Sequence, residues 1–170
     1  ISRFAITPNI LVVTPALPLK TVADLIAWSK TQPQVRLASG GVGSQNHLAG
    51  ALLYTMGKFP ATHMPYRGST APVAAVMAGE SQWTITPAPA VWPLAKAGRL
   101  RALGHSLPKR SPLLGDLPAV AETIPGYEYN NWFGVLAPRA TPDETIAQLR
   151  DNIARALQAK EVRPLLLAQS

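Results

Sequence analysis

Residues 39–47, Ser-Gly-Gly-Val-Gly-Ser-Gln-Asn-His, have the composition of a tight turn that joins a β-strand to an α-helix. The β-prone segment 35–39 leads into the turn, and an apolar period typical of a helix follows at 45–56. Glycine tolerates the backbone conformations of a sharp turn, and Ser44 is a residue type that caps helix N-termini. This order predicts one strand–helix unit of an α/β sheet.

Strand-like and helix-like segments alternate on both sides of this turn. Strands are predicted at 10–14, 35–39, 61–64, 82–86, 100–106 and 127–137. Helices are predicted to start near residues 21, 45, 70, 90 and 141, with a short helix at 119–123 and a final one at 161–167. The β-α-β-α order predicts an α/β fold with a mostly parallel sheet flanked by helices.

Two helices carry more specific expectations about their ends and their buried sides. Thr21 with Asp24, and Thr141 with Glu144, have the spacing of a capping box or a close relative of it. The predicted buried stripes are Leu48, Leu52, Leu53 and Met56 in the 45–56 helix, and Ile146, Leu149, Ile153 and Leu157 in the helix after Thr141.

The composition permits one folded domain or two small lobes. Of the 170 residues, 47% are hydrophobic and 15% are charged, which supplies enough apolar surface for a core. The absence of cysteine excludes a disulfide framework, thiolate metal sites and a cysteine nucleophile. The sequence has no apolar run near the roughly 20 residues that span a bilayer and no recognisable export signal, so we expect a mature, cytosolic or truncated chain.

The net charge of +7 indicates either anionic partners or simply a basic soluble surface. Between Asp24 and Glu80 the sequence contains no carboxylate. The same span contains the cations Lys30, Arg36, Lys58 and Arg67. A small anion would therefore meet no repelling charge from this segment. The cations are dispersed and no aromatic residues are interleaved with them, so we expect no nucleic-acid partner.

The 39–47 turn is the strongest candidate for a binding site. Open α/β sheets bind ligands at the carboxyl ends of their strands, and helix N-termini present partially positive N–H groups. The candidate residues are Ser39, Gly40, Gly41, Gly43, Ser44, Gln45, Asn46 and His47. An ordinary strand–helix connection with its cap is the alternative. The turn lacks Gly-Lys-Ser/Thr, and Asn46 stands in place of the third glycine of a dinucleotide fingerprint, so neither phosphate loop is predicted.

Two further strand ends carry polar residues. The first offers Tyr66, Arg67, Gly68, Ser69 and Thr70. Arg67 could pair with a carboxylate, and the two hydroxyls could donate hydrogen bonds at a helix start; a solvent-facing arginine beside an N-cap is the alternative. The second strand end carries Thr86. Three polar joints after three successive strands predict one shared ligand-binding edge.

Catalysis has little support in the sequence. His47, His63 and His105 are scattered and lack the spacing of metal ligands on one helix. No Gly-x-Ser-x-Gly elbow occurs, and the carboxylates avoid all three joints, so a general acid or base is missing there. Trp132 and Phe133 could line a cleft, but aromatic residues of a strand usually pack in the core. We therefore expect no enzyme activity, no cofactor and no metal.

Three longer strings resemble one known family. These are ASGGVGSQNHLAG at 38–50, HMPYRGSTAPVAAVMAGE at 63–80 and PGYEYNNWFGVLAPRATP at 125–142. Their order and spacing resemble the Bug/TctC family, the extracytoplasmic solute receptors of tripartite tricarboxylate transporters, and the resemblance runs through almost the whole chain.

The resemblance implies a periplasmic-binding-protein type II-like fold with two lobes and a cleft between them. By that mapping, residues 10–130 form the ligand-binding lobe, and residues 1–9 and 131–170 supply hinge strands and part of the second lobe. The family's opening portion and last stretch are absent, so we expect the chain alone to bind ligand weakly or not at all. Ligands of the family are small carboxylates and some uncharged molecules, held by backbone and hydroxyl groups.

The same resemblance suggests residue roles and partners. It places ligand contacts at Ser39, Gly40, Gly43, Ser44 and Asn46, and at Tyr66, Gly68, Ser69 and Thr70. Thr86 stands where the family commonly has Asp, a departure that bears on specificity for amino or hydroxy acids. The implied partners are a small carboxylate and the membrane subunits of the transporter, in the periplasm. A ligand-sensing effector domain of a regulator, which shares this layout, remains the main alternative, ahead of an enzyme on an α/β scaffold.

Overall fold

The computed structural model describes residues 1–162 and 164 of the chain. It divides into two compact units, a larger one of Pro8–Asn130 and a smaller one of Ile1–Thr7 with Asn131–Ser170. Residues 163 and 165–167 of the helix predicted at 161–167 lie outside the described residues. Within the described part of the chain, no helix has the length and apolarity needed to cross a bilayer.

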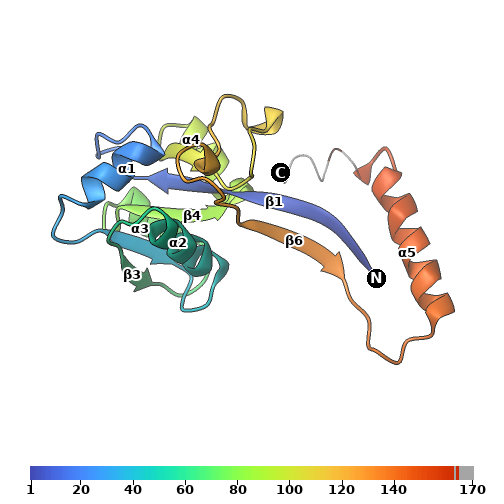
Figure 1. Ribbon diagram of the computed structural model, residues 1–170. Coiled ribbons are helices and arrows are strands. Elements are labelled where there is room, and N and C mark those ends of the chain that lie inside the picture. The colour runs from blue at the N-terminus through green and yellow to red at the C-terminus, as the bar shows by residue number, and fades with distance from the viewer. Residues whose placement is uncertain (163, 165–170) are drawn as a thin grey trace. The chain divides into compact units, whose positions relative to one another are not determined.

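The larger unit is built on a mixed sheet whose strand order is β3-β2-β4-β1-β5 (Figure 1). Its strands are β1 (Ser2–Val13), β2 (Arg36–Ser39), β3 (Thr62–Pro65), β4 (Trp83–Pro87) and β5 (Arg101–His105). β2 runs parallel to both β3 and β4, whereas β1 pairs antiparallel with β4 and β5. The sheet is therefore mostly parallel, as predicted, except for the reversed strand β1. The sequence did not predict this reversal, because hydrophobic periodicity identifies a strand without giving its direction.

Helices cover both faces of this sheet. They are α1 (Val22–Ser29), α2 (Gln45–Met56), α3 (Ala71–Met77) and α4 (Ala88–Lys96), with 3₁₀ turns η1 (Pro112–Leu114) and η2 (Val120–Glu122). Successive residues of a strand point to opposite faces, and β1 follows this rule. Leu11 and Val13 pack with residues of α1 and α2, while Ile10 and Val12 pack with residues of α3 and α4. A central strand that is buried on both sides explains the unbroken apolar run.

Helix α2 begins and ends where the sequence predicts, but its buried side is different. Leu48 is 48% exposed, and the buried residues are Asn46, Ala49, Gly50 and Leu53. A Cβ atom added to Gly50 would lie 2.4 Å from Cδ2 of Leu37 on β2. The helix therefore approaches the sheet through its small residues, and this close approach turns Leu48 toward solvent while Leu52 and Met56 stay partly buried.

The capping box predicted at the start of α1 is present. The Thr21 hydroxyl accepts a hydrogen bond from the Asp24 amide at 3.0 Å, and the Asp24 carboxylate accepts one from the Thr21 amide at 2.9 Å. A further bond from the Lys20 amide, together with those from Thr21, holds the pKa of the Asp24 carboxyl below its usual range. These bonds satisfy N–H groups that the first helical turn leaves without partners.

Thr21→Ala is expected to lower the free energy of unfolding by about 1 kcal/mol, because it removes the hydroxyl that caps α1. Urea denaturation followed by circular dichroism measures this loss. Thr55→Ala is the matched control, since Thr55 is exposed in the last turn of α2 and alanine is the better helix former there. Equal destabilisation by both substitutions would contradict a capping role for Thr21.

The smaller unit differs most from expectation. Its strand β6 (Asn130–Val135), which pairs with β1, is shorter than predicted, and Trp132 and Phe133 are 58% and 50% exposed instead of buried in the core. Helix α5 (Asp143–Gln158) starts after Pro142 without a side-chain cap, so the predicted capping box of Thr141 does not form. No residue of α5 is buried, including its predicted stripe. The apolar residues of this unit have few elements within it to pack against.

Candidate functional site

The three polar joints of the sequence lie at one edge of the larger unit's sheet. Because β3, β2 and β4 are adjacent and parallel, their carboxyl ends meet on the same side. The Tyr66 amide donates to the Ser39 carbonyl at 2.8 Å, and Nδ2 of Asn46 donates to Oγ1 of Thr86 at 3.0 Å. We call these joined segments, residues 39–47, 66–70 and 86, the strand-end edge.

The first two joints touch through their backbones. A Cβ atom added to Gly40 would lie 2.9 Å from the carbonyl oxygen of Gly68, closer than side chains come in proteins. Gly41 and Gly43 have φ angles of +125° and +75°, and Gly68 has +84°, conformations that suit glycine. The glycines therefore allow the two loops to lie side by side.

The turn at the start of α2 is held by Ser44. Its hydroxyl donates to the Gly41 carbonyl at 2.7 Å and accepts a hydrogen bond from the His47 amide at 3.4 Å, which makes it the N-cap that the sequence predicts. The first turn of α2 contains no acidic residue, so the partial positive charge of its N–H groups is not neutralised. This helix start suits an anionic group.

The candidate residues divide into buried and accessible sets. Ser39, Asn46 and Thr86 are almost fully buried, at 0%, 3% and 2% exposure, and lie beneath the accessible residues of the edge. The accessible or partly accessible candidates are Gly40, Gly41, Gly43, Ser44, Gln45, His47, Tyr66, Arg67, Gly68, Ser69 and Thr70. Thr70 occupies the N-cap position of α3, close to the predicted helix start, but its side chain makes no cap hydrogen bond.

Sequence reasoning missed Asn9, a polar residue buried beside the edge. Asn9 lies opposite Pro87 in the β1–β4 pairing, next to Thr86. Its amide donates to Oγ of Ser106 at 2.8 Å, and its side-chain Nδ2 donates to the carbonyl of Tyr129 at 2.9 Å. An asparagine directly before the apolar run of β1 is the signal that could have identified it, because buried polar side chains need partners.

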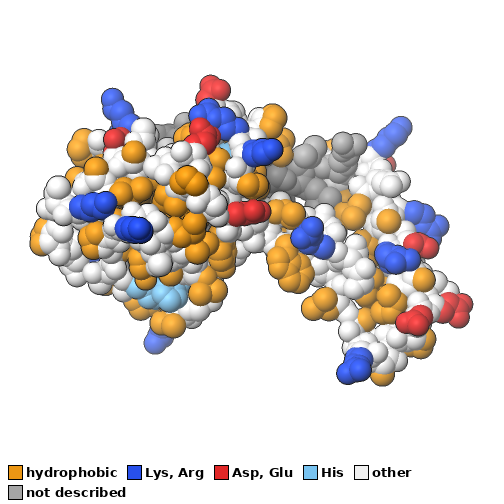
Figure 2. All heavy atoms as spheres, viewed as in Figure 1, with side chains coloured by type: hydrophobic (Ala, Val, Ile, Leu, Met, Phe, Trp, Pro, Cys, Tyr) orange, Lys and Arg blue, Asp and Glu red, His pale blue; other side chains and the backbone are white. Residues whose placement is uncertain are grey.

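The structure also brings together two histidines that lie far apart in the sequence. The rings of His47 on α2 and His63 on β3 are stacked, with centroids 3.8 Å apart and planes inclined by 19°. Nδ1 of His47 accepts a hydrogen bond from the Gly43 amide at 3.1 Å, and Nε2 of His63 contacts Oγ of Ser39. Figure 2 shows histidine side chains gathered at one place on the surface of the larger unit. Burial, and next the charge of His47, lower the pKa of His63.

The functional groups of the edge are hydrogen-bond donors and acceptors. Segments 39–47 and 66–70 and residue 86 contain no carboxylate, and within the described residues no group of three or more His, Cys, Asp or Glu could hold a metal ion. Backbone amides, hydroxyls and Arg67 supply hydrogen-bond donors instead. Such donors bind a carboxylate without transferring protons to it.

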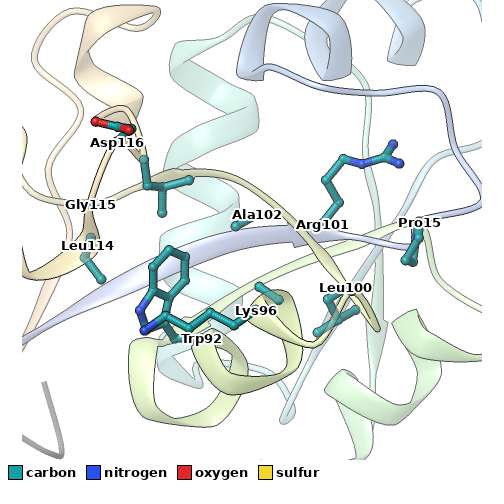
Figure 3. A pocket seen from close by; sticks show the side chains of 12 residues that line it. Pro15, Trp92, Lys96, Leu100, Arg101, Ala102, Leu114, Gly115 and Asp116 are labelled. Atoms are coloured by element: carbon teal, nitrogen blue, oxygen red, sulfur yellow. The ribbon is translucent and has the colours of Figure 1, made fainter.

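A separate pocket of about 520 Å³ lies at the other end of the sheet (Figure 3). It is lined by Trp92 and Lys96 of α4, by the start of β5 and by the turn at Asp116. Lys96 Nζ lies 5.2 Å from the centre of the Trp92 ring. Arg101 donates to the carbonyls of Leu17 and Leu19 at 2.6 and 3.0 Å, so its charge is used to hold a loop. This pocket shares no residue with the strand-end edge.

Comparisons with known proteins agree with one another. The model of the TctC family, described as "Tripartite tricarboxylate transporter family receptor", matches residues 1–170. The chain is 33% identical to protein BugT of Bordetella pertussis (strain Tohama I) over 171 residues, which cover 99% of this chain and 52% of BugT. The chain spans about half the length of the curated relatives that it matches first.

Two solved structures share the fold with high similarity. One is R. palustris Rpa4515 with adipate, with a TM-score of 0.87 and 36% identity over 98% of this chain and 57% of that one. The other is MatC (Rpa3494) from Rhodopseudomonas palustris with bound malate, with a TM-score of 0.81 and 25% identity over 93% of this chain and 54% of that one.

Proposed function

This chain belongs to the TctC family of tripartite tricarboxylate transporter receptors, and from that premise we propose that its strand-end edge captures a small dicarboxylate for transport. The observation that carries the proposal is the contact of two glycine-containing loops at the ends of parallel strands, where Gly40 lies against the Gly68 carbonyl. Two related structures hold the dicarboxylates adipate and malate. The class of ligand is inferred from these relatives and from the donors of the edge.

The recognition we propose uses backbone N–H groups and hydroxyls more than charge. The amides at the start of α2 hydrogen-bond one carboxylate, as helix N-termini do for anions, and the glycine turn lets the ligand approach them closely. Ser69 and Thr70 are exposed hydroxyls at the start of α3, and Arg67 adds a cation beside them. The absence of carboxylates from these segments removes like-charge repulsion of the ligand. Small dicarboxylates therefore suit the edge better than cationic ligands.

The two units suggest how capture proceeds. We assign ligand binding to the larger unit and a hinge role to the segments that cross between units, near Thr7–Ile10 and Asn131–Val135. In proteins that close around a ligand, a few residues at element ends absorb the backbone rotation. The closed receptor then delivers the ligand to the membrane subunits of the transporter, and the periplasm is the compartment where this occurs.

Titration with adipate tests the proposal. We expect the ¹H–¹⁵N NMR signals of Gly41, Gly43 and Gly68 to shift as adipate is added, even where binding is weak. Arg67→Gln is expected to raise the dissociation constant about tenfold, because charge-assisted hydrogen bonds contribute on the order of 1.5–3 kcal/mol. Arg99→Gln removes the same charge from an exposed turn before β5, away from the edge, and is expected to leave binding unchanged.

Two results would contradict the proposed function. The first is the absence of any shift at the edge with adipate or malate, even at concentrations that detect the weak binding expected of this chain. The second is a set of shifts confined to the pocket of Trp92 and Lys96, at the other end of the sheet. Arginine serves as the cationic comparison ligand and is expected to cause no shift at the edge.

A further inference from the structure

The stacked imidazoles of His47 and His63 are joined to two separate points of the glycine turn. His47 accepts from the Gly43 amide at 3.1 Å, and His63 contacts the Ser39 hydroxyl. That hydroxyl in turn accepts from the Gly41 amide and donates to the Gly41 carbonyl, both at 3.2 Å. The imidazole pair thus reaches both glycines whose positive φ angles shape the turn.

We propose that His47 and His63 are positioning residues, which hold the glycine turn in its ligand-binding conformation only while both imidazoles are neutral. One consequence of this inference is that carboxylate binding depends on pH, and that consequence rests on the proposed function. Its structural part, the coupling of the turn to the imidazoles, stands on the geometry alone.

The hydrogen bond to His47 requires one protonation state. An imidazole nitrogen accepts a hydrogen bond only when it carries no proton. Since Nδ1 of His47 accepts from the Gly43 amide, the neutral ring carries its proton on Nε2. Protonation of Nδ1 places two N–H donors face to face, which breaks the bond and releases the turn at Gly43.

The contact of His63 with Ser39 transmits a change of that ring to Gly41. With the proton of His63 on Nε2, the Ser39 oxygen accepts from the ring and from the Gly41 amide and donates to the Gly41 carbonyl. This arrangement uses the one donor and the two lone pairs of the hydroxyl. A displacement of the His63 ring therefore removes a partner from a hydroxyl that is fully buried and loosens the turn at Gly41.

Stacking makes the second protonation unfavourable. Two charged rings with centroids 3.8 Å apart would repel each other. Burial lowers the pKa of His63 most, and the charge of His47 on α2 lowers it further. On β2, the residue paired with His63 is the apolar Leu37, and the neighbouring Arg36 directs its guanidinium to Gln34 and to the Glu80 carbonyl. Arg67, in the loop after β3, is exposed.

The direction of the pH effect follows from this environment. A histidine whose pKa is lowered by folding favours the neutral form in the folded protein, so the folded arrangement is favoured above the ordinary value of 6.5. As the pH falls below that value, the turn conformation loses stability progressively until His63 is protonated. Acidification is therefore expected to open the turn and to weaken binding, whereas alkaline pH leaves both unchanged.

NMR titration of the chain without ligand tests the structural part. Between pH 8 and pH 5, the amide signals of Gly41 and Gly43 are expected to move together with the imidazole signals of His63. The double variant His47→Asn/His63→Gln keeps a neutral hydrogen-bonding atom in place of Nδ1 and of Nε2 and has no ionisable ring. In this variant the two glycine amides are expected to stay still over the same range.

Adipate binding tests the functional part with the same proteins. From pH 7.5 to pH 5, wild type is expected to lose about tenfold more affinity than the double variant, since affinity falls about tenfold per pH unit below the pKa of a group that must be neutral. The comparison with the double variant corrects for protonation of adipate itself. His47→Leu, which has no acceptor for the Gly43 amide, is expected to bind more weakly already at pH 7.5.

The outcomes separate the two proposals. The inference is overturned if the glycine amide signals do not change with pH in wild type, or if they change equally in the double variant. This holds whether or not adipate binds. Glycine amides that titrate in wild type alone support it. If no variant binds adipate at any pH, the proposed function fails, and the amide titration still decides whether the imidazole pair positions the turn. Circular dichroism melts at each pH show whether a variant has unfolded.

Discussion

Gly40→Ala is expected to weaken adipate binding by about a hundredfold and to leave the fold intact. The added Cβ atom would lie 2.9 Å from the Gly68 carbonyl oxygen, and backbone atoms have little room to move away. The loops at 39–47 and 66–70 must then separate, which pulls donors of the two loops out of reach of one ligand. Losing one or two such hydrogen bonds costs on the order of 1–3 kcal/mol each, and each 1.4 kcal/mol is a factor of about ten.

The control for this substitution is Gly79→Ala. Gly79 follows α3 at the end away from the edge, has a φ of +78°, and an added Cβ atom there would meet nothing within 4 Å. Alanine there costs stability, about 1 kcal/mol from the strained φ, without touching the edge. We expect Gly79→Ala to lower the melting temperature and to leave the affinity for adipate unchanged. Gly40→Ala is expected to lower the affinity for adipate strongly and the melting temperature only slightly. Undiminished adipate binding by Gly40→Ala would mean that the ligand does not use the contact between the loops.

The strand-end edge was the most predictable part of the molecule. Its joints are local features, since a glycine turn, a serine N-cap and an apolar helix period occur within about twenty residues of one another. Helix α2 accordingly begins after Ser44 and ends at Met56, as the sequence predicts. That the three joints meet at one edge follows from a rule about parallel strands, and the bonds of Tyr66 to Ser39 and of Asn46 to Thr86 agree with it.

Features that depend on distant packing were not predictable. Leu48 belongs to the predicted buried stripe of α2, yet the helix packs through Ala49 and Gly50, because Leu37 of β2 lies directly against Gly50. The pairing of His47 with His63 depends in the same way on β3 lying beside β2, and 16 positions in the sequence separate the two rings. Helical spacing rules for metal ligands do not detect such a pair.

The smaller unit shows a different limit of sequence reasoning. Aromatic residues of a strand are usually buried, but Trp132 and Phe133 are half exposed within this chain. Pattern rules assume that every apolar face has a partner, and the described elements of this unit supply few. The capping box expected at Thr141 failed for a local reason: the helix begins after Pro142, which places Thr141 one residue before the N-cap.

The free energy of unfolding is expected to fall by about 3–5 kcal/mol in Trp83→Ala, the largest stability change we predict. Trp83 is fully buried at the start of β4, where it lies opposite Val13 of β1 and Leu37 of β2. Its ring centroid is 5.9 Å from that of Phe59. Removing the indole leaves a cavity at the centre of the α1/α2 side of the sheet, which neighbouring strands cannot collapse to fill.

Trp83→Phe separates the contribution of packing from that of the indole N–H. Within the described residues, Nε1 of Trp83 has no hydrogen-bond partner, and a buried donor without a partner is itself destabilising. Phenylalanine keeps much of the volume and removes this donor, so its cost is expected to be well below that of alanine, under about 1.5 kcal/mol. Urea denaturation of the three proteins measures both values. A loss below 1 kcal/mol in Trp83→Ala, or equal losses in both variants, would show that the sheet is not built around this side chain.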